Sequence, residues 1–209
     1  MEERIIQSQK CINEGAFFLA GIEPRFEYAL NVTGELPLRL SAEGFERLLS
    51  AIISQQVSVA AANSIWKRLV KANLNGPRKI MRAKDEELRA VGLSRQKVRY
   101  ARALAEANIN FKSLRSVSTS EVVKKLTQVP GIGVWTAEIY AMFSLGRADV
   151  FAAGDLALQE SARLLFELNQ RPTERQIRLM AESWSPWRAV AARLLWAYYA
   201  YTKKREGVR

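Results

Sequence analysis

The fold is decided by the stretch TQVPGIGVWTAEIYAMFSLGRADVFAAGD, residues 127–155. Its Pro130-Gly131-x-Gly133 corner lies between two segments of helical character, and Asp155 follows the second glycine by 22 residues. Glycine is needed where the backbone takes a positive φ or where another group approaches closely. Two helices joined by such a corner point backbone N–H groups outward, which favours binding of an anion such as a phosphate. An ordinary helix–helix turn is the alternative.

Helical patterns continue on both sides of this stretch. Apolar residues recur at helical spacing in 48–53 and 62–70, and the polar corner SQQVS, residues 54–58, separates these two segments. Ser185-Pro186 predicts a helix cap and a first-turn proline ahead of the apolar segment 187–201. Strand patterns are scarce. The sequence therefore predicts an all-α fold with short loops.

The composition narrows both the partner and the chemistry. The 209 residues include 32 Lys and Arg against 21 Asp and Glu, a net charge of +11. This balance favours a polyanionic partner such as DNA or RNA, although charge can also simply keep a protein soluble. The chain has no histidine and one cysteine, Cys11. These counts exclude histidine-based triads, cysteine-clustered zinc, four-cysteine iron–sulfur clusters and internal disulfides.

The sequence also bears on the compartment. No apolar run approaches the length of a membrane span, and the first ten residues, MEERIIQSQK, lack the apolar core of a signal peptide. We expect a protein of the cytoplasm (the nucleoid) or the nucleus that is not secreted and has no membrane partner.

Three motifs together resemble one known family. Residues 126–137, Leu-x-x-Val-Pro-Gly-Ile-Gly-x-x-Thr-Ala, resemble the helix-hairpin-helix of the DNA glycosylase superfamily that also carries a Gly/Pro-rich loop ending in an aspartate. Trp-x-Pro-Trp-Arg at 184–188, followed by Trp196, and the segment 48–69 are similar to the 3-methyladenine DNA glycosylase II branch. The resemblance covers roughly residues 41–199. Several members of this branch carry an additional α/β domain, for which the first 40 residues are too short.

The resemblance implies a two-lobed helical fold. One lobe would consist of residues 1–40 plus 144–209. The other would consist of residues 41–143 and carry the helix-hairpin-helix at about 121–145.

It also implies excision of alkylated bases, of the 3-methyladenine and 7-methylguanine type, from double-stranded DNA. Asp155 would be the catalytic carboxylate, which stabilises the oxocarbenium-like sugar as the base departs. An N-cap role in the next helix is the structural alternative for Asp155, and the two roles are compatible. Lyase members of the superfamily carry a lysine two residues after the second hairpin glycine. Trp135 stands there, and residues 129–201 contain no lysine, so we expect a monofunctional enzyme.

The base pocket follows from the same resemblance. Trp135 and Trp196 would line it, because electron-rich rings attract the cationic bases that alkylation produces. Ile139 stands where the family has a tyrosine, and Ala197 where it has a further aromatic residue. These two departures leave the lesion open. Core packing is the alternative for each tryptophan, and we expect it for Trp184 and Trp187.

The DNA contacts are predicted in two places. A side chain from the loop 54–58 would fill the hole left by a flipped base, with Gln56 as the first candidate and Gln55 as the second. A polar inter-helix turn is the alternative. Basic residues near 95–99 could reach the DNA backbone or form a solvated face. The hairpin residues expected to bind phosphate are Gly131, Ile132, Gly133 and Thr136.

No cofactor is expected to be required, although the resemblance allows a structural Na⁺ or K⁺ at the carbonyls of Val129 and Ile132. We expect a monomer. Two alternative functions stay open: the same fold acting on uracil, hypoxanthine or another lesion, and a non-catalytic helix-hairpin-helix protein that only binds DNA.

Overall fold

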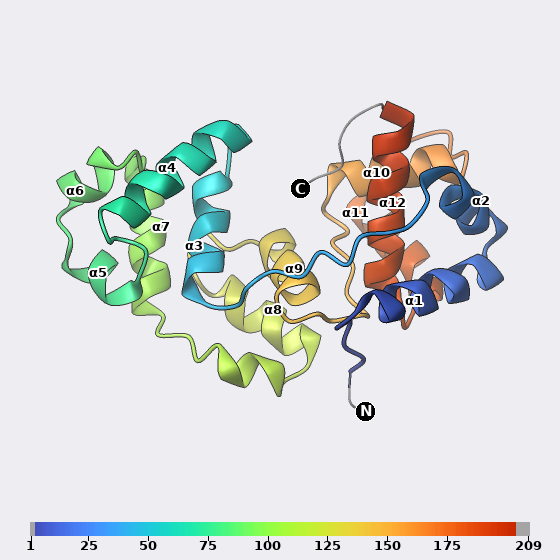
Figure 1. Cartoon of the computed structure of the whole chain (residues 1–209), viewed down its shortest axis with the longest axis horizontal. Coiled ribbons are helices and arrows are strands. Elements are labelled where there is room, and N and C mark those ends of the chain that lie inside the picture. Colours follow the sequence, from blue (N-terminus) through green and yellow to red (C-terminus); the bar gives the residue numbers. More distant parts are fainter. Residues whose placement is uncertain (1–2, 204–209) are drawn as a thin grey trace. The chain divides into compact units, whose positions relative to one another are not determined.

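The computed structural model describes residues 3–203 (Figure 1). The chain forms two compact units. We call residues 41–140 the hairpin unit, and residues 1–40 with 141–209 the aspartate unit. The sequence placed the second boundary after Phe143, whereas the contacts place it after Tyr140, inside a helix.

The hairpin unit is built around one central helix. Its helices are α3 (Phe45–Ser54), α4 (Val59–Lys71), α5 (Pro77–Arg82), α6 (Asp85–Ala90), α7 (Arg95–Glu106), the 3-10 helix η1 (Lys112–Arg115), α8 (Thr119–Thr127) and most of α9 (Val134–Phe143). Helix α7 packs against α3, α5 and α6. The apolar faces of α3 and α7 are fully buried, as their helical spacing predicts: Leu48, Leu49, Ile52, Ile53, Val98, Ala101 and Leu104.

The aspartate unit is built around its long last helix. It contains α1 (Gln9–Ile22), α2 (Pro24–Thr33), α10 (Leu156–Leu165), α11 (Glu174–Met180), the 3-10 helix η2 (Ala181–Trp184) and α12 (Arg188–Lys203). Helix α12 packs against α1, α2 and α10, and Figure 1 shows it as the red helix among them. The predicted core tryptophans are confirmed, because Trp184 and Trp187 are each 3% exposed.

The predicted start of the last helix is wrong. Helix α12 begins at Arg188, so Pro186 is not in its first turn. The Ser185 hydroxyl does not cap the helix, because it donates to Asp149 Oδ2 at 2.8 Å. The Trp187 N–H instead closes a turn onto the Trp184 carbonyl at 2.8 Å.

The all-α prediction is confirmed. Across residues 3–203 the only strand-like pairing is an isolated antiparallel bridge between Ile5 and Arg147. Next to it, Gly146 has φ +70°, and a Cβ there would meet the Ile6 carbonyl oxygen at 2.7 Å, so this close approach requires glycine. Within the same span, none of the helices has both the length and the apolar character needed to cross a bilayer.

Candidate functional site

The structure explains the glycines at positions 131 and 133 of the hairpin in different ways. Gly131 has φ +93°, and a Cβ there would lie 2.4 Å from Tyr100 Cγ. A Cβ on Gly133 would meet nothing within 4 Å, and Gly133 is exposed. Ile132 between them is buried, and its N–H donates to the Val129 carbonyl at 3.0 Å. Gly131 therefore serves internal packing, while Gly133 leaves the surface of the corner open to a close neighbour.

The corner presents backbone amides at the start of α9. The Ala137 N–H donates to the Gly133 carbonyl at 3.0 Å. The amides of Gly133 and Val134 precede this bond and have no acceptor within the helix, which is the geometry that suits a phosphate oxygen. The Thr136 side chain is buried, so any contribution of this predicted phosphate residue comes from its backbone.

Two side-chain hydrogen bonds, one from Gln55 and one from Lys97, hold the loop between α3 and α4 in place. Gln55 Nε2 donates to the Gly131 carbonyl at 2.9 Å, which ties the loop to the hairpin. Lys97 Nζ donates to the Ile53 carbonyl at 2.7 Å, at the end of α3, and partial burial lowers the pKa of this ammonium group. Gln56 is exposed and has φ +56°, a left-handed conformation that costs roughly 1–2 kcal/mol for a residue with a Cβ. One glutamine is thus an anchor, and the other projects outward.

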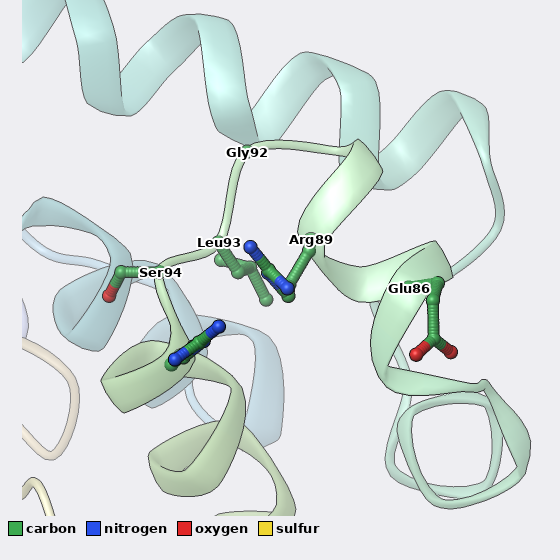
Figure 2. Close-up of a pocket in the computed structure, with 6 residues that line it drawn as sticks. Glu86, Arg89, Gly92, Leu93 and Ser94 are labelled. Atoms are coloured by element: carbon green, nitrogen blue, oxygen red, sulfur yellow. The ribbon is translucent and has the colours of Figure 1, made fainter.

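The loop, the hairpin and the start of α7 enclose a hollow of about 580 Å³. Its lining includes both glutamines and both hairpin glycines, so the structure brings these predicted DNA-contacting residues together within one unit. A second hollow, of about 480 Å³, lies along the turn from α6 to α7 (Figure 2). Its lining residues are Glu86, Arg89, Gly92, Leu93, Ser94 and Arg95. Of the candidate DNA-contacting residues it includes Arg95, and it includes none of the predicted hairpin, wedge or base-pocket residues.

In the aspartate unit, Asp155 is the N-cap of α10. Its Oδ1 accepts hydrogen bonds from the backbone N–H groups of Ala157 at 2.9 Å and Leu158 at 3.1 Å. It also accepts one from Trp196 Nε1 at 3.3 Å. The capping role is confirmed, and these three donors fix the orientation of the carboxylate.

An aromatic pair and a buried cation lie behind this carboxylate. Phe143 stacks on Trp196, with ring centroids 5.8 Å apart and planes at 29°. The guanidinium carbon of Arg193 lies 4.7 Å from the centroid of the Phe143 ring. Arg193 is 2% exposed, and burial, aided by the charge of Arg39, lowers its pKa to about 9. The guanidinium therefore remains protonated at neutral pH.

Phe143 and Arg193 were missed from the sequence. In the sequence, nothing distinguishes Phe143 from the other apolar residues at the end of its helix. Arg193 is the single charge between residues 189 and 202, and this isolation within an apolar segment was the available signal. Only the fold shows that the two side chains meet.

The remaining predicted pocket residues lie on α9. Trp135 is 41% exposed, whereas Ile139 is half-buried; both belong to the hairpin unit. Trp196 is 4% exposed and belongs to the aspartate unit, with Asp155. Within residues 3–203, no three histidine, cysteine, aspartate or glutamate side chains gather where they could hold a metal ion.

Comparison with known proteins is consistent with this arrangement. The sequence profile of the HhH-GPD superfamily base excision DNA repair proteins matches residues 49–188. The chain is 31% identical over 207 residues to DNA-3-methyladenine glycosylase 1 of Schizosaccharomyces pombe, covering 93% of this chain and 90% of that protein.

Two solved structures extend the similarity to the fold. The S. pombe 3-methyladenine DNA glycosylase in complex with abasic DNA superposes with a TM-score of 0.78 and 30% identity, over 91% of this chain and 97% of that one. The DNA-3-methyladenine glycosidase of Bacillus halodurans gives a TM-score of 0.78 and 30% identity, over 98% of this chain and 96% of that one.

Proposed function

Since the chain belongs to the HhH-GPD superfamily of base excision DNA repair proteins, we propose that it is a monofunctional DNA glycosylase. It flips alkylated bases, of the 3-methyladenine and 7-methylguanine type, out of duplex DNA and hydrolyses their bond to deoxyribose. It acts as a monomer, in the nucleoid or the nucleus.

The proposal rests on the hydrogen bonds that hold the carboxylate of Asp155. Three N–H donors converge on one carboxylate oxygen and fix the side chain at the start of a helix. As the base leaves, positive charge develops on the sugar, and a fixed carboxylate stabilises that charge without having to reorganise. A second role for the carboxylate is to orient the water molecule that attacks the sugar. Neither role needs a histidine, which the chain lacks.

The hairpin unit supplies the grip on DNA. The amides of Gly133 and Val134 bind a backbone phosphate, since the Ile132 N–H is already engaged with the Val129 carbonyl, and Gln56 fills the space in the stack that the flipped base vacates. The anchored Gln55 supports the assignment of the wedge to Gln56, because its amide is already engaged with the Gly131 carbonyl. Trp135 and Ile139 of the hairpin unit, and Trp196 of the aspartate unit, are the residues that we propose contact the flipped base.

Excision needs no cofactor. A Na⁺ or K⁺ ion at the carbonyls of Val129 and Ile132 fits the hairpin, because the Val129 carbonyl accepts one hydrogen bond, from Ile132, and keeps a second lone pair. The ion would stiffen the corner and lend positive charge near the phosphate.

The test is base release from DNA methylated to carry 3-methyladenine and 7-methylguanine. Wild type should release both free bases. Asp155→Asn should release little while still binding DNA. Borohydride should trap no covalent enzyme–DNA adduct, because residues 129–201 hold no lysine to form one.

Other results would select another function. DNA binding without base release from methylated DNA or from a panel of uracil, hypoxanthine and cyclic adducts would favour a non-catalytic DNA-binding protein. Release of one of those lesions alone would keep the enzyme and change its substrate.

A further inference from the structure

The first described residues of the chain are bonded to the segment that follows α9. We call residues 3–6 the N-terminal segment. The Ile6 N–H donates to the Gly146 carbonyl at 2.7 Å, and the Ala148 N–H donates to the Arg4 carbonyl at 3.0 Å. Residues at the end of a chain are usually poorly ordered unless contacts of this kind fix them. Two backbone hydrogen bonds therefore hold the N-terminal segment against residues 146–148.

Side chains on both partners support the same contact. Arg147 Nη1 lies 3.0 Å from Glu3 Oε2, and the side chain of Arg147 is only 5% exposed. Ile6 is fully buried and serves as an apolar anchor. Because a Cβ on Gly146 would meet the Ile6 carbonyl oxygen at 2.7 Å, only glycine allows the two backbones to lie this close. The contact is thus specified by residue type on each side.

Residues 146–148 lie between two groups of the proposed excision site. Three residues before Gly146 is Phe143, which stacks on Trp196, and Trp196 donates to Asp155. After Ala148 the chain reaches Asp155 without a helix or a strand, and residues 150–153 are buried. Because no regular element fixes this stretch, its place depends on the contacts that it makes.

The start of α12 makes the other contacts at this end of the stretch. The Ala189 N–H donates to the Ala148 carbonyl at 2.9 Å, and Arg188 Nε lies 3.0 Å from Asp149 Oδ1. Ala148 is therefore bonded through its N–H to the N-terminal segment and through its carbonyl to α12. Without the N-terminal segment, Ala148 would be held from one side only.

The placement of a catalytic carboxylate matters more than its mere presence. A displacement of about 1 Å at a reacting centre can cost about 10²-fold in rate. We propose that the N-terminal segment is a positioning element of the excision site. It holds residues 146–148, and through them Phe143 and Asp155, in the arrangement that excision requires. This inference rests on the proposed function and adds to it a role for a segment far from Asp155 in the sequence.

The test detaches the segment in two ways in the full chain. Ile6→Asp places a charge at a buried position, so the segment should leave the surface. Gly146→Ala pushes the Ile6 carbonyl away from the other side. Each variant should lower the single-turnover rate on a 7-methylguanine duplex at saturating enzyme by about tenfold, while the Kd for that duplex stays within about twofold of wild type. Ile6→Val, which keeps the apolar anchor, should retain the wild-type rate.

Gly34→Ala is the matched control. Gly34 lies in the same unit and has φ +74°, against +70° for Gly146, but a Cβ there would meet nothing within 4 Å. Both alanines therefore carry the same left-handed penalty, and only Gly146→Ala displaces the N-terminal segment. Gly34→Ala should leave the rate unchanged. An equal loss of rate in the two alanine variants would overturn the inference.

The double variant tests whether the two changes act through one contact. Once Ile6→Asp has detached the segment, Gly146→Ala should lower the rate by less than about twofold further. Losses that multiply to about a hundredfold would mean that the two changes act independently, which would overturn the inference.

Hydrogen exchange of the Ala157 and Leu158 amides, which donate to Asp155, gives a readout without DNA. Exchange should be several-fold faster in Ile6→Asp than in wild type, because the carboxylate is held less firmly. An unchanged exchange rate would contradict a positioning role. If Ile6→Asp does not fold, Ile6→Ala makes the same comparisons.

A role in stability alone predicts a different result. At a temperature where circular dichroism shows every variant to be fully folded, the rates would then equal that of wild type. Wild type that releases bases, with rates that Ile6→Asp and Gly146→Ala leave unchanged, would remove the inference alone. Wild type that releases no base from any lesion would remove the proposed function and the inference with it.

Discussion

The hairpin unit and the aspartate unit expose their candidate groups in opposite ways. In the hairpin unit, Gly133 and Gln56 are exposed, and much of the expected contact is made by backbone amides. In the aspartate unit, Trp196 and Arg193 are almost completely buried, and two backbone amides and the Trp196 side chain hold the carboxylate. A surface that grips the DNA backbone must be open, whereas a site that stabilises developing charge gains strength from exclusion of water. On this basis we propose that the hairpin unit binds the DNA backbone and that the aspartate unit supplies the catalytic carboxylate.

The largest effect is expected from substitution of Asp155. Two variants separate the proposed catalytic role of this residue from its helix-capping role. Asp155→Asn keeps an acceptor for the amides of Ala157 and Leu158, and asparagine caps helices well, so the unfolding free energy should change by less than about 0.5 kcal/mol. Base release should fall by about 10³-fold or more, since the negative charge is lost.

Asp155→Ala should lose the same activity and, in addition, about 1 kcal/mol of stability with the cap. Urea unfolding and single-turnover excision measure the two quantities. The matched control is Asp85→Asn, at an exposed aspartate in the hairpin unit. An Asn variant as destabilised as the Ala variant would mean that the charge at 155 is structural.

The next comparison uses the two hairpin glycines. Gly131→Ala forces a Cβ into Tyr100 at a left-handed φ, so it should cost about 2–4 kcal/mol of stability. Gly133→Ala has free space around the new methyl group and should fold normally. It should nevertheless weaken DNA binding, because we propose that the DNA backbone approaches Gly133 closely. Equal thermal stability of the two variants would contradict this division.

Substitution of Gln56 is a third test, in which stability should rise while excision activity falls. Gln56→Gly removes the penalty of the left-handed conformation and should raise stability by up to about 1 kcal/mol. Excision should fall by about tenfold, because nothing then fills the space left by the flipped base. Fluorescence of 2-aminopurine next to the lesion reports the flipping. Unchanged fluorescence and excision would remove Gln56 as the wedge.

The smallest expected effect concerns the basic residues at the start of α7. Arg95 is exposed and free to reach a phosphate, whereas Lys97 holds the Ile53 carbonyl. Arg95→Ala should remove about one phosphate contact. The slope of the logarithm of the binding constant against the logarithm of the salt concentration should therefore become shallower by about 0.9. Lys97→Met should leave that slope unchanged and loosen the loop after α3. A similar slope change in both variants would place Lys97 on the DNA.

What the sequence could predict depends on how local each feature is. The glycine corner, the polar loop and the cap at Asp155 lie within short segments, so residue type and spacing specify them. The start of α12 was mispredicted because Ser185 bonds to Asp149, 36 residues away in the chain. The contact of Arg193 with Phe143 and the anchoring of Gln55 on Gly131 join distant segments in the same way, and no local pattern encodes them.

The central claim is that the hairpin unit binds the DNA backbone and that the aspartate unit supplies the carboxylate for excision. The most direct measurement determines, for Asp155→Asn and Gly133→Ala together, the Kd for lesion-containing duplex and the single-turnover rate at saturating enzyme. We predict that Asp155→Asn loses rate and keeps a Kd within about twofold of wild type, and that Gly133→Ala loses affinity and keeps most of its rate. Loss of affinity by Asp155→Asn as large as its loss of rate would contradict the division.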